Sequence, residues 1–425
     1  MRICLYEDRR AADLYPLTLT RPASDLLCGL NTLGEKQARY FGADVVGHLC
    51  RPALAEWLRA RDRRDPVNDP TWLRAAPAVL VNARWLPPRP PAARDLFSEG
   101  PVVGTVSGEV AFAVLDTRRL QAVSPATVEE CLGDWAQSLP SREVGGTVIR
   151  RAWELVEHNG PEIAADFEFA ADHNATDFHP PGVARVGPPD RLFVHPTARV
   201  DPHVVADTTH GPVVIGESAV VTAFTRLEGP CAIGPHTHLH AAQIRRGTSI
   251  GPHCRVGGEV EASVVLGYTN KYHDGFLGHS YLGEWVNLAA GTSTADLRYD
   301  YGEVRVPVNG AEVPTRQTKV GSVVGDHAKT GLGVLLNCGT ALGAFAHVMP
   351  TGTLAPREVP SFHRTGPDGM KELDVPGLLA TADVVMRRRG RAMTLELEAL
   401  YRALAGVPQG VPAREPVALP LRKSA

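Results

Sequence analysis

The sequence predicts an N-terminal α/β domain, an all-β parallel β-helix after it, and a helix near the C-terminus. An aliphatic residue that returns every six residues between about Val194 and Leu354, often with glycine directly after it, predicts the β-helix. Short apolar runs that alternate with helical patterns in residues 1–175 predict the α/β domain. Such alternation is typical of a sheet covered by helices.

A period of six fits neither the 3.6 residues of a helical turn nor the two-residue alternation of a half-buried strand. It fits a three-sided prism in which one aliphatic residue per face points to the axis and three faces close a coil of about eighteen residues. Coils stack about 4.8 Å apart through backbone hydrogen bonds. A β-sandwich, the alternative, gives no reason to repeat at six. The predicted inward residues are Ile215, Val221, Leu227, Ile233, Leu239, Ile244, Ile250, Val256, Val324, Leu336, Leu342, Val348 and Leu354, with Thr330 at one weak position.

The α/β domain and its flanking segments follow from local patterns. The stretch 167–190, rich in Asp, Asn, His, Pro and Gly, indicates a linker or docking arm. We expect buried strands at 3–6, 78–81 and 110–115 and helices at 52–61, 127–139 and 151–165, which predict a parallel sheet with covering helices. The predicted parts are a domain at 1–175, a linker at 176–192, the β-helix at 193–356, and a tail at 357–425 whose helix at about 378–405 caps the open end of the prism.

Composition excludes several classes of partner. The 44 basic and 47 acidic residues give no basic footprint for nucleic acid. No run of eighteen apolar residues exists, and the N-terminus is too short for a signal h-region, so we expect a cytoplasmic chain that does not enter a membrane. The seven cysteines are scattered without a CxxC pair, which favours reduced thiols and no metal site.

The loop after the first strand reads Tyr-Pro-Leu-Thr-Leu-Thr-Arg-Pro at residues 15–22, and Thr-Leu-Gly-Glu-Lys follows at 32–36. It resembles the first loop of the sugar nucleotidyltransferase superfamily, Gly-x-Gly-Thr-Arg-Leu-x-Pro-Leu-Thr followed by Pro-Lys. The resemblance implies a Rossmann-like, nucleotidyltransferase-like domain that acts on a sugar 1-phosphate with UTP or another NTP.

This loop departs from the family pattern in its chemistry. The glycine-rich part falls on residues 8–12, the activating arginine on Asp13 and the lysine on Ala23, while Val-Asn-Ala-Arg at 81–84 replaces the usual magnesium carboxylate. A phosphate cradle needs close backbone N–H groups and cations. Thr18, Arg21 and Arg84 are therefore candidates for this loop's phosphate contacts, and magnesium would have to bind without its usual ligand. The alternative is that both arginines support the fold.

Between residues 257 and 302 polar and aromatic residues interrupt the repeat, and such conflicts tend to mark functional sites. The segment around Val286 to Thr292 resembles the acetyltransferase half of the bifunctional UDP-N-acetylglucosamine pyrophosphorylase and glucosamine-1-phosphate N-acetyltransferase family. This resemblance implies a left-handed, hexapeptide-repeat β-helix, acetyl-CoA as co-substrate, and a homotrimer with substrates between subunits. It places the catalytic histidine on His273 and a backbone contact to acetyl-CoA on Ala290.

The chemistry agrees with a histidine, because only the free amine of an amino sugar attacks a thioester and a base must take its proton. Asp274 or Glu261 could orient the ring, and His279 is the alternative base. The family's substrate asparagine falls on Asp296 and its phosphate lysine on Glu261, so other residues must hold a phosphate or the acceptor differs. The remaining candidates for the substrate are Asn270, Lys271 and Arg298.

Three further features carry alternatives. His236, His238 and His240 alternate, which allows a metal site but favours an exposed face; a zinc carbonic anhydrase is a weaker alternative for the pair His273 and His279. Asn309-Gly310 predicts a hairpin between 304–308 and 311–313 that could form a wall of the cleft between subunits. The arginines at 387–389 lie on the predicted terminal helix, either as a solvated face or as contacts to CoA phosphates.

These observations favour N-acetylation of an amino-sugar phosphate or nucleotide amino sugar, coupled to nucleotidyl transfer if the first domain is active. Nucleotidyl transfer alone, with the β-helix as a trimerisation scaffold, is a second hypothesis. A non-catalytic trimer that binds a sugar nucleotide is the third.

Overall fold

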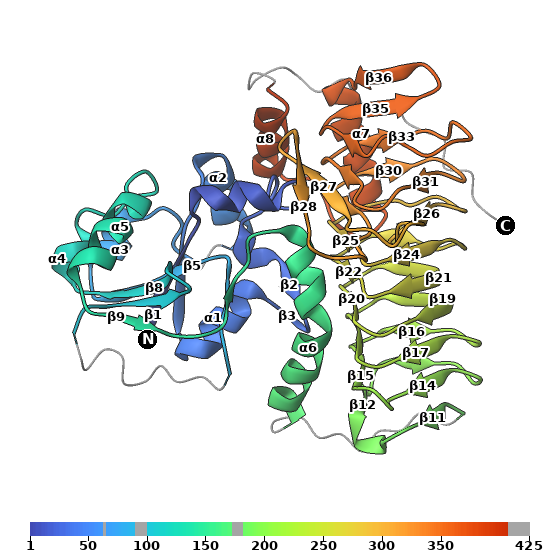
Figure 1. The fold of residues 1–425 in the computed structure, drawn as a ribbon, viewed down its shortest axis with the longest axis horizontal. Coiled ribbons are helices and arrows are strands. Elements are labelled where there is room, and N and C mark those ends of the chain that lie inside the picture. The colour runs from blue at the N-terminus through green and yellow to red at the C-terminus, as the bar shows by residue number, and fades with distance from the viewer. Residues whose placement is uncertain (63–64, 90–99, 172–181, 407–425) are drawn as a thin grey trace.

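A computed structural model describes residues 1–62, 65–89, 100–171 and 182–406 of the chain. The N-terminal domain contains a six-stranded sheet in the order β4-β1-β5-β8-β7-β9 (Figure 1). Its strands are β1 (Arg2–Tyr6), β4 (Val45–Leu49), β5 (Ala78–Asn82), β7 (Val102–Val106), β8 (Glu109–Leu115) and β9 (Ser141–Glu143). The three expected strands are confirmed.

The sheet is mixed, so the predicted all-parallel arrangement is only partly right. β1 is parallel to β4 and β5, but β8 is antiparallel to β5 and β7. The reason is local: β7 and β8 are joined by a tight turn at Ser107 and Gly108, both with positive φ. A two-residue turn of this kind joins only antiparallel strands.

The helices around this sheet are α1 (Leu33–Phe41), α2 (Pro52–Arg61), α3 (Pro70–Arg74), α4 (Thr117–Leu120), α5 (Val128–Ser138) and α6 (Ala152–Ala171), with 3-10 turns at Arg9–Leu14 and Ala23–Asp25. Short strands β2 (Leu27–Cys28), β3 (Asn31–Thr32), β6 (Trp85–Leu86) and β10 (Thr147–Val148) complete the domain. Thr32 and Glu35 start α1 with a reciprocal capping box. The expected helices at 52–61 and 127–139 are confirmed, and the third runs on to Ala171.

The β-helix has three faces. The first, here called the domain face, is a nine-stranded parallel sheet of β12 (Leu192–Val194), β15 (Val213–Ile215), β18 (Cys231–Ile233), β20 (Thr248–Ile250), β22 (Val264–Val265), β25 (Tyr281–Leu282), β29 (Val323–Val324), β32 (Ala341–Leu342) and β34 (Glu358–Val359). The second, the helix face, contains β13 (Arg199–Val200), β16 (Val220–Val221), β23 (Asn270–Lys271), β30 (Lys329–Thr330), β33 (His347–Val348) and β35 (His363–Gly366), with β36 (Gly369–Glu372) paired to β35.

The third, the open face, contains β11 (Ala184–Val186), β14 (Val205–Asp207), β17 (Arg226–Glu228), β24 (Phe276–Gly278), β26 (Ser293–Thr294) and β31 (Leu335–Leu336). Two longer strands, β19 (His238–Ile244) and β21 (Arg255–Glu261), bend from the helix face onto the open face. The β-helix therefore begins before residue 193 and continues past 356. Part of the predicted linker, 176–181, and the end of the tail, 407–425, lie outside the described residues.

The six-residue repeat forms the predicted aliphatic column. Parallel pairing aligns Ile215, Ile233, Ile250, Val265, Leu282, Val324, Leu342 and Val359 along the domain face, all buried. Burying each such side chain stabilises the fold by about 1.5–3 kcal/mol. Leu354 is an exception: it pairs with the outward Leu335 and is 55% exposed, while Ala355 points inward instead.

A ladder of stacked rings follows the corner between the domain face and the helix face. His236, His253, Tyr268, Trp285, His327, Phe345 and Phe362 all have positive φ and stack at centroid distances of 4.1–6.1 Å. His240 stacks separately on Tyr272. No group of three or more metal-ligating side chains occurs within the described residues.

The C-terminal helices pack on this ladder and on α2. The predicted single helix at 378–405 is two helices, α7 (Val375–Arg387) and α8 (Leu395–Leu404). The break follows from Gly390, whose φ of +69° cannot continue a helix. In the described part of the chain, none of the helices is long and apolar enough to cross a membrane.

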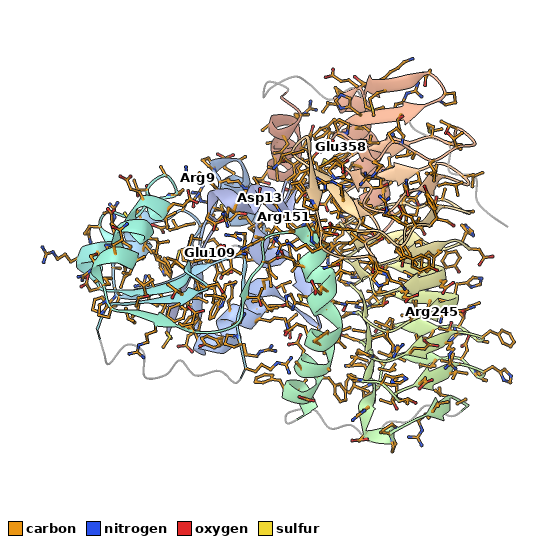
Figure 2. The ribbon with its side chains drawn as sticks, in the orientation of Figure 1. Arg9, Asp13, Glu109, Arg151, Arg245 and Glu358 are labelled. Atoms are coloured by element: carbon orange, nitrogen blue, oxygen red, sulfur yellow. The ribbon has the colours of Figure 1, made fainter. Side chains whose placement is uncertain are left out.

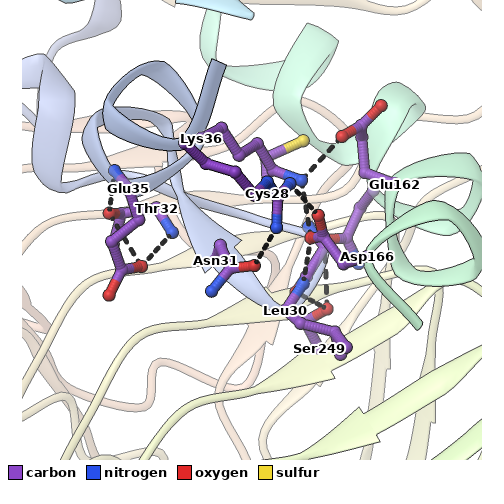
Figure 3. A network of polar contacts seen from close by, with 12 residues as sticks. Cys28, Leu30, Asn31, Thr32, Glu35, Lys36, Glu162, Asp166 and Ser249 are labelled. Atoms are coloured by element: carbon purple, nitrogen blue, oxygen red, sulfur yellow. Dashed lines mark hydrogen bonds and ion pairs between the residues drawn. The ribbon is translucent and has the colours of Figure 1, made fainter. Parts of the chain in front are cut away.

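The N-terminal domain docks on the β-helix through α6, which stands beside the domain face (Figure 1). A buried polar network lies at this contact (Figure 3). Asp166 accepts hydrogen bonds from Lys36, Arg39 and the Leu30 N–H, while Ser249 of the β-helix donates to the Gly29 carbonyl at 2.8 Å. The two parts of the chain therefore share one continuous interior.

The Asn309-Gly310 hairpin is confirmed as β27 (Arg305–Val308) and β28 (Ala311–Pro314). Its position differs from the expected wall of a cleft between subunits. Val304, Val306 and Val308 pack on Trp153 of α6, and the Asn309 amide donates to the Ala12 carbonyl at 3.3 Å. The hairpin's apolar side is thus used against its own N-terminal domain.

Candidate functional site

The structure brings His273 and Ala290 to one corner of the prism, between the helix face and the open face. This open corner consists of residues 272–275 in one coil and 289–291 in the next. The Gly291 N–H donates to the Asp274 carbonyl at 2.9 Å and joins the two turns. Gly275 is required here, because a Cβ would lie 2.1 Å from the Thr292 carbonyl oxygen. His273 is exposed and stands edge-on to Tyr272 at 5.6 Å.

Lys271 lies beneath this corner, inside the prism, at a position where neighbouring coils carry aliphatic residues such as Val256. Its Nζ donates to the carbonyls of Gly257, His273 and Gly275 at 2.8, 3.0 and 2.7 Å. The ammonium is therefore already fully used by the backbone, and Lys271 cannot reach a substrate phosphate. Instead it fixes the backbone that carries His273.

The environment of Lys271 gives a pH-dependent stability. Burial lowers the pKa of this lysine to about 8, against the opposing charges of Asp274 and Glu259. In the unfolded chain its pKa is about 10.4, so between about pH 8 and 10 the unfolded state binds more protons. The contribution of Lys271 to stability therefore rises with pH, by roughly 1 kcal/mol per pH unit.

Urea titrations at pH 8, 9 and 10 measure the free energy of unfolding of the native chain and of Lys271→Met. The difference between them, native minus variant, is expected to increase with pH by about this slope. Lys329, whose pKa burial also lowers to about 8, is common to both proteins and cancels. Lys371→Met, which removes a half-exposed lysine paired with Asp368, is the control and should leave the slope unchanged. Parallel stability curves for native protein and Lys271→Met would refute a charged, buried Lys271.

A second polar group lies just after β24, the open-face strand that follows the open corner. His279 Nδ1 and Asp296 Oδ2 are 2.7 Å apart. The backbone N–H of His279 donates to the Glu261 carbonyl at 3.0 Å. Although burial alone would raise it, the hydrogen bond from His279 lowers the pKa of the Asp296 carboxyl below its ordinary value. Asp296, which the sequence predicts at the substrate, therefore also hydrogen-bonds the imidazole of His279. Such a pair fixes the imidazole tautomer.

Lys319, which the sequence did not single out, joins this group. Its Nζ is 3.8 Å from a Glu261 carboxylate oxygen. Lys319 follows the inserted hairpin, fifty-eight positions from Glu261 in the numbering, so no local pattern could have associated the two residues. It is the cation that the structure places beside Glu261, the position matched to the family's phosphate lysine.

Asn270 and Arg298 do not join either group. The Asn270 amide donates to Asn287 Oδ1 at 2.7 Å on the helix face. Arg298 is exposed and binds Asp300, with Nε to Oδ1 at 2.8 Å. Asp274 is exposed at the open corner, next to His273.

The N-terminal domain has a separate crevice at the carboxyl ends of β1 and β5, where the chain connections diverge on the two sides of β1. Open α/β sheets bind ligands at such a point. The crevice has a volume of about 520 Å³, and its lining includes Asp8, Arg10, Asn82, Arg84 and Glu109. Figure 2 shows Arg9, Asp13, Glu109 and Arg151 around this part of the domain.

The loop candidates are engaged within the fold. Arg84 is buried, donates from Nε to Asp8 Oδ1 at 2.8 Å and from Nη1 to the Ile149 carbonyl at 2.6 Å. Thr18 Oγ1 donates to the Ala11 carbonyl at 2.6 Å. Arg21 is buried and bonded to Asp326 of the β-helix. The structure thus accounts for Thr18 and Arg21 by fold support.

The residues of the crevice do not fit a magnesium site. Asp8 is the carboxylate of the crevice lining that lies just beyond β1, but Arg84 occupies its Oδ1, while Arg84 and the Asn82 amide occupy its Oδ2. At the end of β5 an amide, Asn82, replaces a carboxylate. A hard divalent cation prefers free carboxylate oxygens.

Comparisons with known proteins agree with this two-part architecture. Residues 3–174 match the family described as sugar nucleotidyl transferase. A bifunctional sugar-1-phosphate nucleotidylyltransferase/acetyltransferase of Sulfurisphaera tokodaii is 34% identical over 160 residues, which is 35% of this chain and 38% of that protein. Proteins named bifunctional protein GlmU match at 33% over 24% of this chain and 25% of the relative in Methanococcus vannielii, and at 31% over 37% and 30% in Acaryochloris marina.

These matches span well under two thirds of the relatives' own lengths. A solved Arabidopsis UDP-N-acetylglucosamine acyltransferase aligns with 48% of this chain and 77% of its own, at 16% identity and a TM-score of 0.24, a score that supports no inference. The chain thus has a sugar nucleotidyl transferase-type N-terminal domain followed by a β-helix, and it resembles the bifunctional nucleotidylyltransferase/acetyltransferases.

Proposed function

We propose that this chain is a transferase of sugar-nucleotide biosynthesis whose β-helix moves an acetyl group from acetyl-CoA to the amine of an amino sugar. The observation that carries the proposal is the hydrogen bond from Gly291 N–H to the Asp274 carbonyl, which holds the turn of His273 against the turn of Ala290. The resemblance assigns the base to the first turn and the acetyl-CoA contact to the second.

In the proposed reaction His273 takes a proton from the amino group, and the free amine attacks the thioester carbonyl. The C–N bond forms as the carbonyl oxygen becomes an oxyanion, which a backbone N–H near Ala290 stabilises. The attacking nitrogen then releases its second proton to water, collapse of the intermediate breaks the C–S bond, and the CoA thiolate receives the proton held by His273. Lys271 donates to the His273 carbonyl and fixes the turn that carries the base.

The acceptor we propose is an amino-sugar phosphate similar to glucosamine 1-phosphate, or a nucleotide amino sugar. Glu261 and Asp296 place two carboxylates at the end of the open face, and Lys319 is the cation beside them. Lys319 would therefore bind the phosphate of an amino-sugar phosphate. The carboxylates favour hydroxyl groups of the sugar.

Thiol release from acetyl-CoA tests the proposal with a panel of amino-sugar 1-phosphates, nucleotide amino sugars and free amino sugars. Release that depends on one acceptor class supports acetyl transfer and identifies the acceptor. If none of the acceptors releases thiol, acetyl transfer is wrong.

We propose further that three copies assemble through their open faces. Leu335 and Leu354 pair across adjacent coils on this face and are 42% and 55% exposed. Exposed apolar side chains that adjoin in a sheet are typical of an interface. An assembly of this kind would place a neighbouring chain beside His273 and His279.

Leu335→Glu is expected to dissociate the assembly to monomers in analytical ultracentrifugation, because it places a charge in an apolar contact. Leu395→Glu is the matched control: Leu395 is 81% exposed on α8, away from the open face, and the change should leave the sedimentation coefficient unaltered. A monomeric native chain, or a Leu335→Glu variant that remains assembled, would contradict this interface.

Nucleotidyl transfer is the second candidate function, favoured by the family match over residues 3–174. The crevice at β1 and β5 would hold the nucleotide, with Arg9 and Arg10 as its exposed cations. Pyrophosphate release from UTP and a sugar 1-phosphate tests this activity, with and without magnesium. Binding of a nucleotide sugar without release would favour the non-catalytic alternative.

A further inference from the structure

We infer that the groove between α7 and the helix face binds the phosphate groups of a nucleotide-type ligand. The groove encloses about 260 Å³ and is lined by Tyr268, Asn270, Trp285, Val286, Asn287, Lys329, Val385, Arg388 and Arg389. Figure 1 shows α7 beside the coils of β30 and β33. Three cations therefore face one cavity whose lining contains no carboxylate.

Arg388, Arg389 and Lys329 have no acidic partner among the described residues. Lys329 donates only to the His327 carbonyl, at 3.2 Å, and the Nε of Arg389 is buried without a hydrogen-bond partner in the described part of the chain. The cations also repel one another: burial and Arg388 lower the pKa of Arg389, and burial and Arg389 lower the pKa of nearby Arg255.

An uncompensated cluster of like charges destabilises the folded chain on its own. A bound anion reverses this effect, because guanidinium groups make paired, charge-assisted hydrogen bonds to phosphate oxygens. The side-chain oxygen Oδ1 of Asn287 accepts a hydrogen bond from Asn270. The side-chain NH2 group of Asn287 bonds to no other described residue and adds two donors to the groove. The donors and charges of the groove thus suit a phosphate or diphosphate.

The preceding arginine makes a sharp contrast. Arg387 and Arg388 are both exposed, but the Nε of Arg387 donates to Asp383 Oδ2 at 2.7 Å, one turn earlier on α7, whereas Arg388 has no acidic partner among the described residues. Among three consecutive arginines, the first is neutralised and the next two line the cavity. A merely solvated basic helix end gives no reason for this difference.

The groove lies on a face next to the open corner. Asn270 precedes His273 by three residues, and Asn287 precedes Ala290 by three, a distance of about 10 Å in extended chain. A ligand with its phosphate in the groove could therefore extend its reactive end to the corner. Two sources share this chemistry, the diphosphate of CoA and that of a nucleotide sugar, and both fit the proposed function without requiring turnover.

Isothermal titration calorimetry on the full chain tests the site with four probes: CoA, dephospho-CoA, UDP-N-acetylglucosamine and inorganic pyrophosphate. The double variant Arg388→Gln/Arg389→Gln is expected to weaken at least one probe by about tenfold or more, with a reduced dependence on salt. Arg387→Gln removes one positive charge from the same end of α7 and should leave the Kd unchanged. Lys329→Gln, on the prism itself, should weaken the same probe.

The probe that loses affinity identifies the source, and a difference between CoA and dephospho-CoA assigns the 3′-phosphate. Equal Kd values for native chain and double variant with all probes, or an equal loss in Arg387→Gln, would overturn the site. Binding of a probe without thiol release from any acceptor would contradict the proposed acetyl transfer but still support this phosphate site. The two failures are therefore distinguishable.

Discussion

Replacing His273 by alanine is expected to lower kcat for acetyl transfer by about 10²- to 10⁴-fold, the usual contribution of a general base. KM should change little, because the side chain is exposed at the open corner and its removal leaves the backbone bonds of Lys271 and Gly291 intact. Initial rates of thiol release with the acceptor identified above measure the effect, and an unchanged urea midpoint shows that the fold is kept.

His279→Ala is the matched comparison. It removes an imidazole from the other end of the same strand and leaves Asp296 without the hydrogen bond that lowers its carboxyl pKa. If His273 is the base, His279→Ala should raise KM more than it lowers kcat. The opposite split, with His273→Ala nearly as active as the native chain, would identify the His279 and Asp296 pair as the catalytic base.

Asp326→Ala is expected to produce the largest loss of stability, about 3–5 kcal/mol, because the buried Arg21 then keeps only the more exposed carboxylate of Glu284, 3.3 Å away. Asp326 accepts hydrogen bonds from Thr20 Oγ1, from Arg21 and, at 2.8 Å, from the Glu284 N–H. Arg21 and Asp326 are both buried, and the pair joins the N-terminal domain to the β-helix. Urea titration of the full chain measures the loss.

The double variant Arg21→Leu/Asp326→Leu removes both charges and keeps apolar side chains in the space that they fill. It should be less destabilised than the sum of its single changes, because neither charge is then left alone in the interior. Asp300→Asn, which affects an exposed pair with Arg298, should leave the urea midpoint unchanged. Additive losses would show that Arg21 and Asp326 do not interact in solution.

The β-helix could be predicted from the six-residue repeat. Ile215, Ile233 and Ile250 recur at intervals set by the geometry of one coil, and their burial follows from the period alone. The hairpin at Asn309-Gly310 was equally predictable, because both residues adopt the positive φ that its turn needs. The prediction that Leu354 points inward was wrong because the last coil places Ala355 inward. A shift of one residue exchanges the inside and the outside of a strand.

The roles of the polar residues depend on contacts between segments that are distant in the sequence. Lys271 is in a sequence position that suits a phosphate contact, yet the alignment of coils turns it into the prism. Arg21 meets Asp326 across more than three hundred residues, and Asp296 meets His279 only after the chain completes a coil. Apolar periodicity is local and repeats with the backbone geometry, whereas a charge takes its role from whichever partner the docking of distant segments brings within a few ångströms.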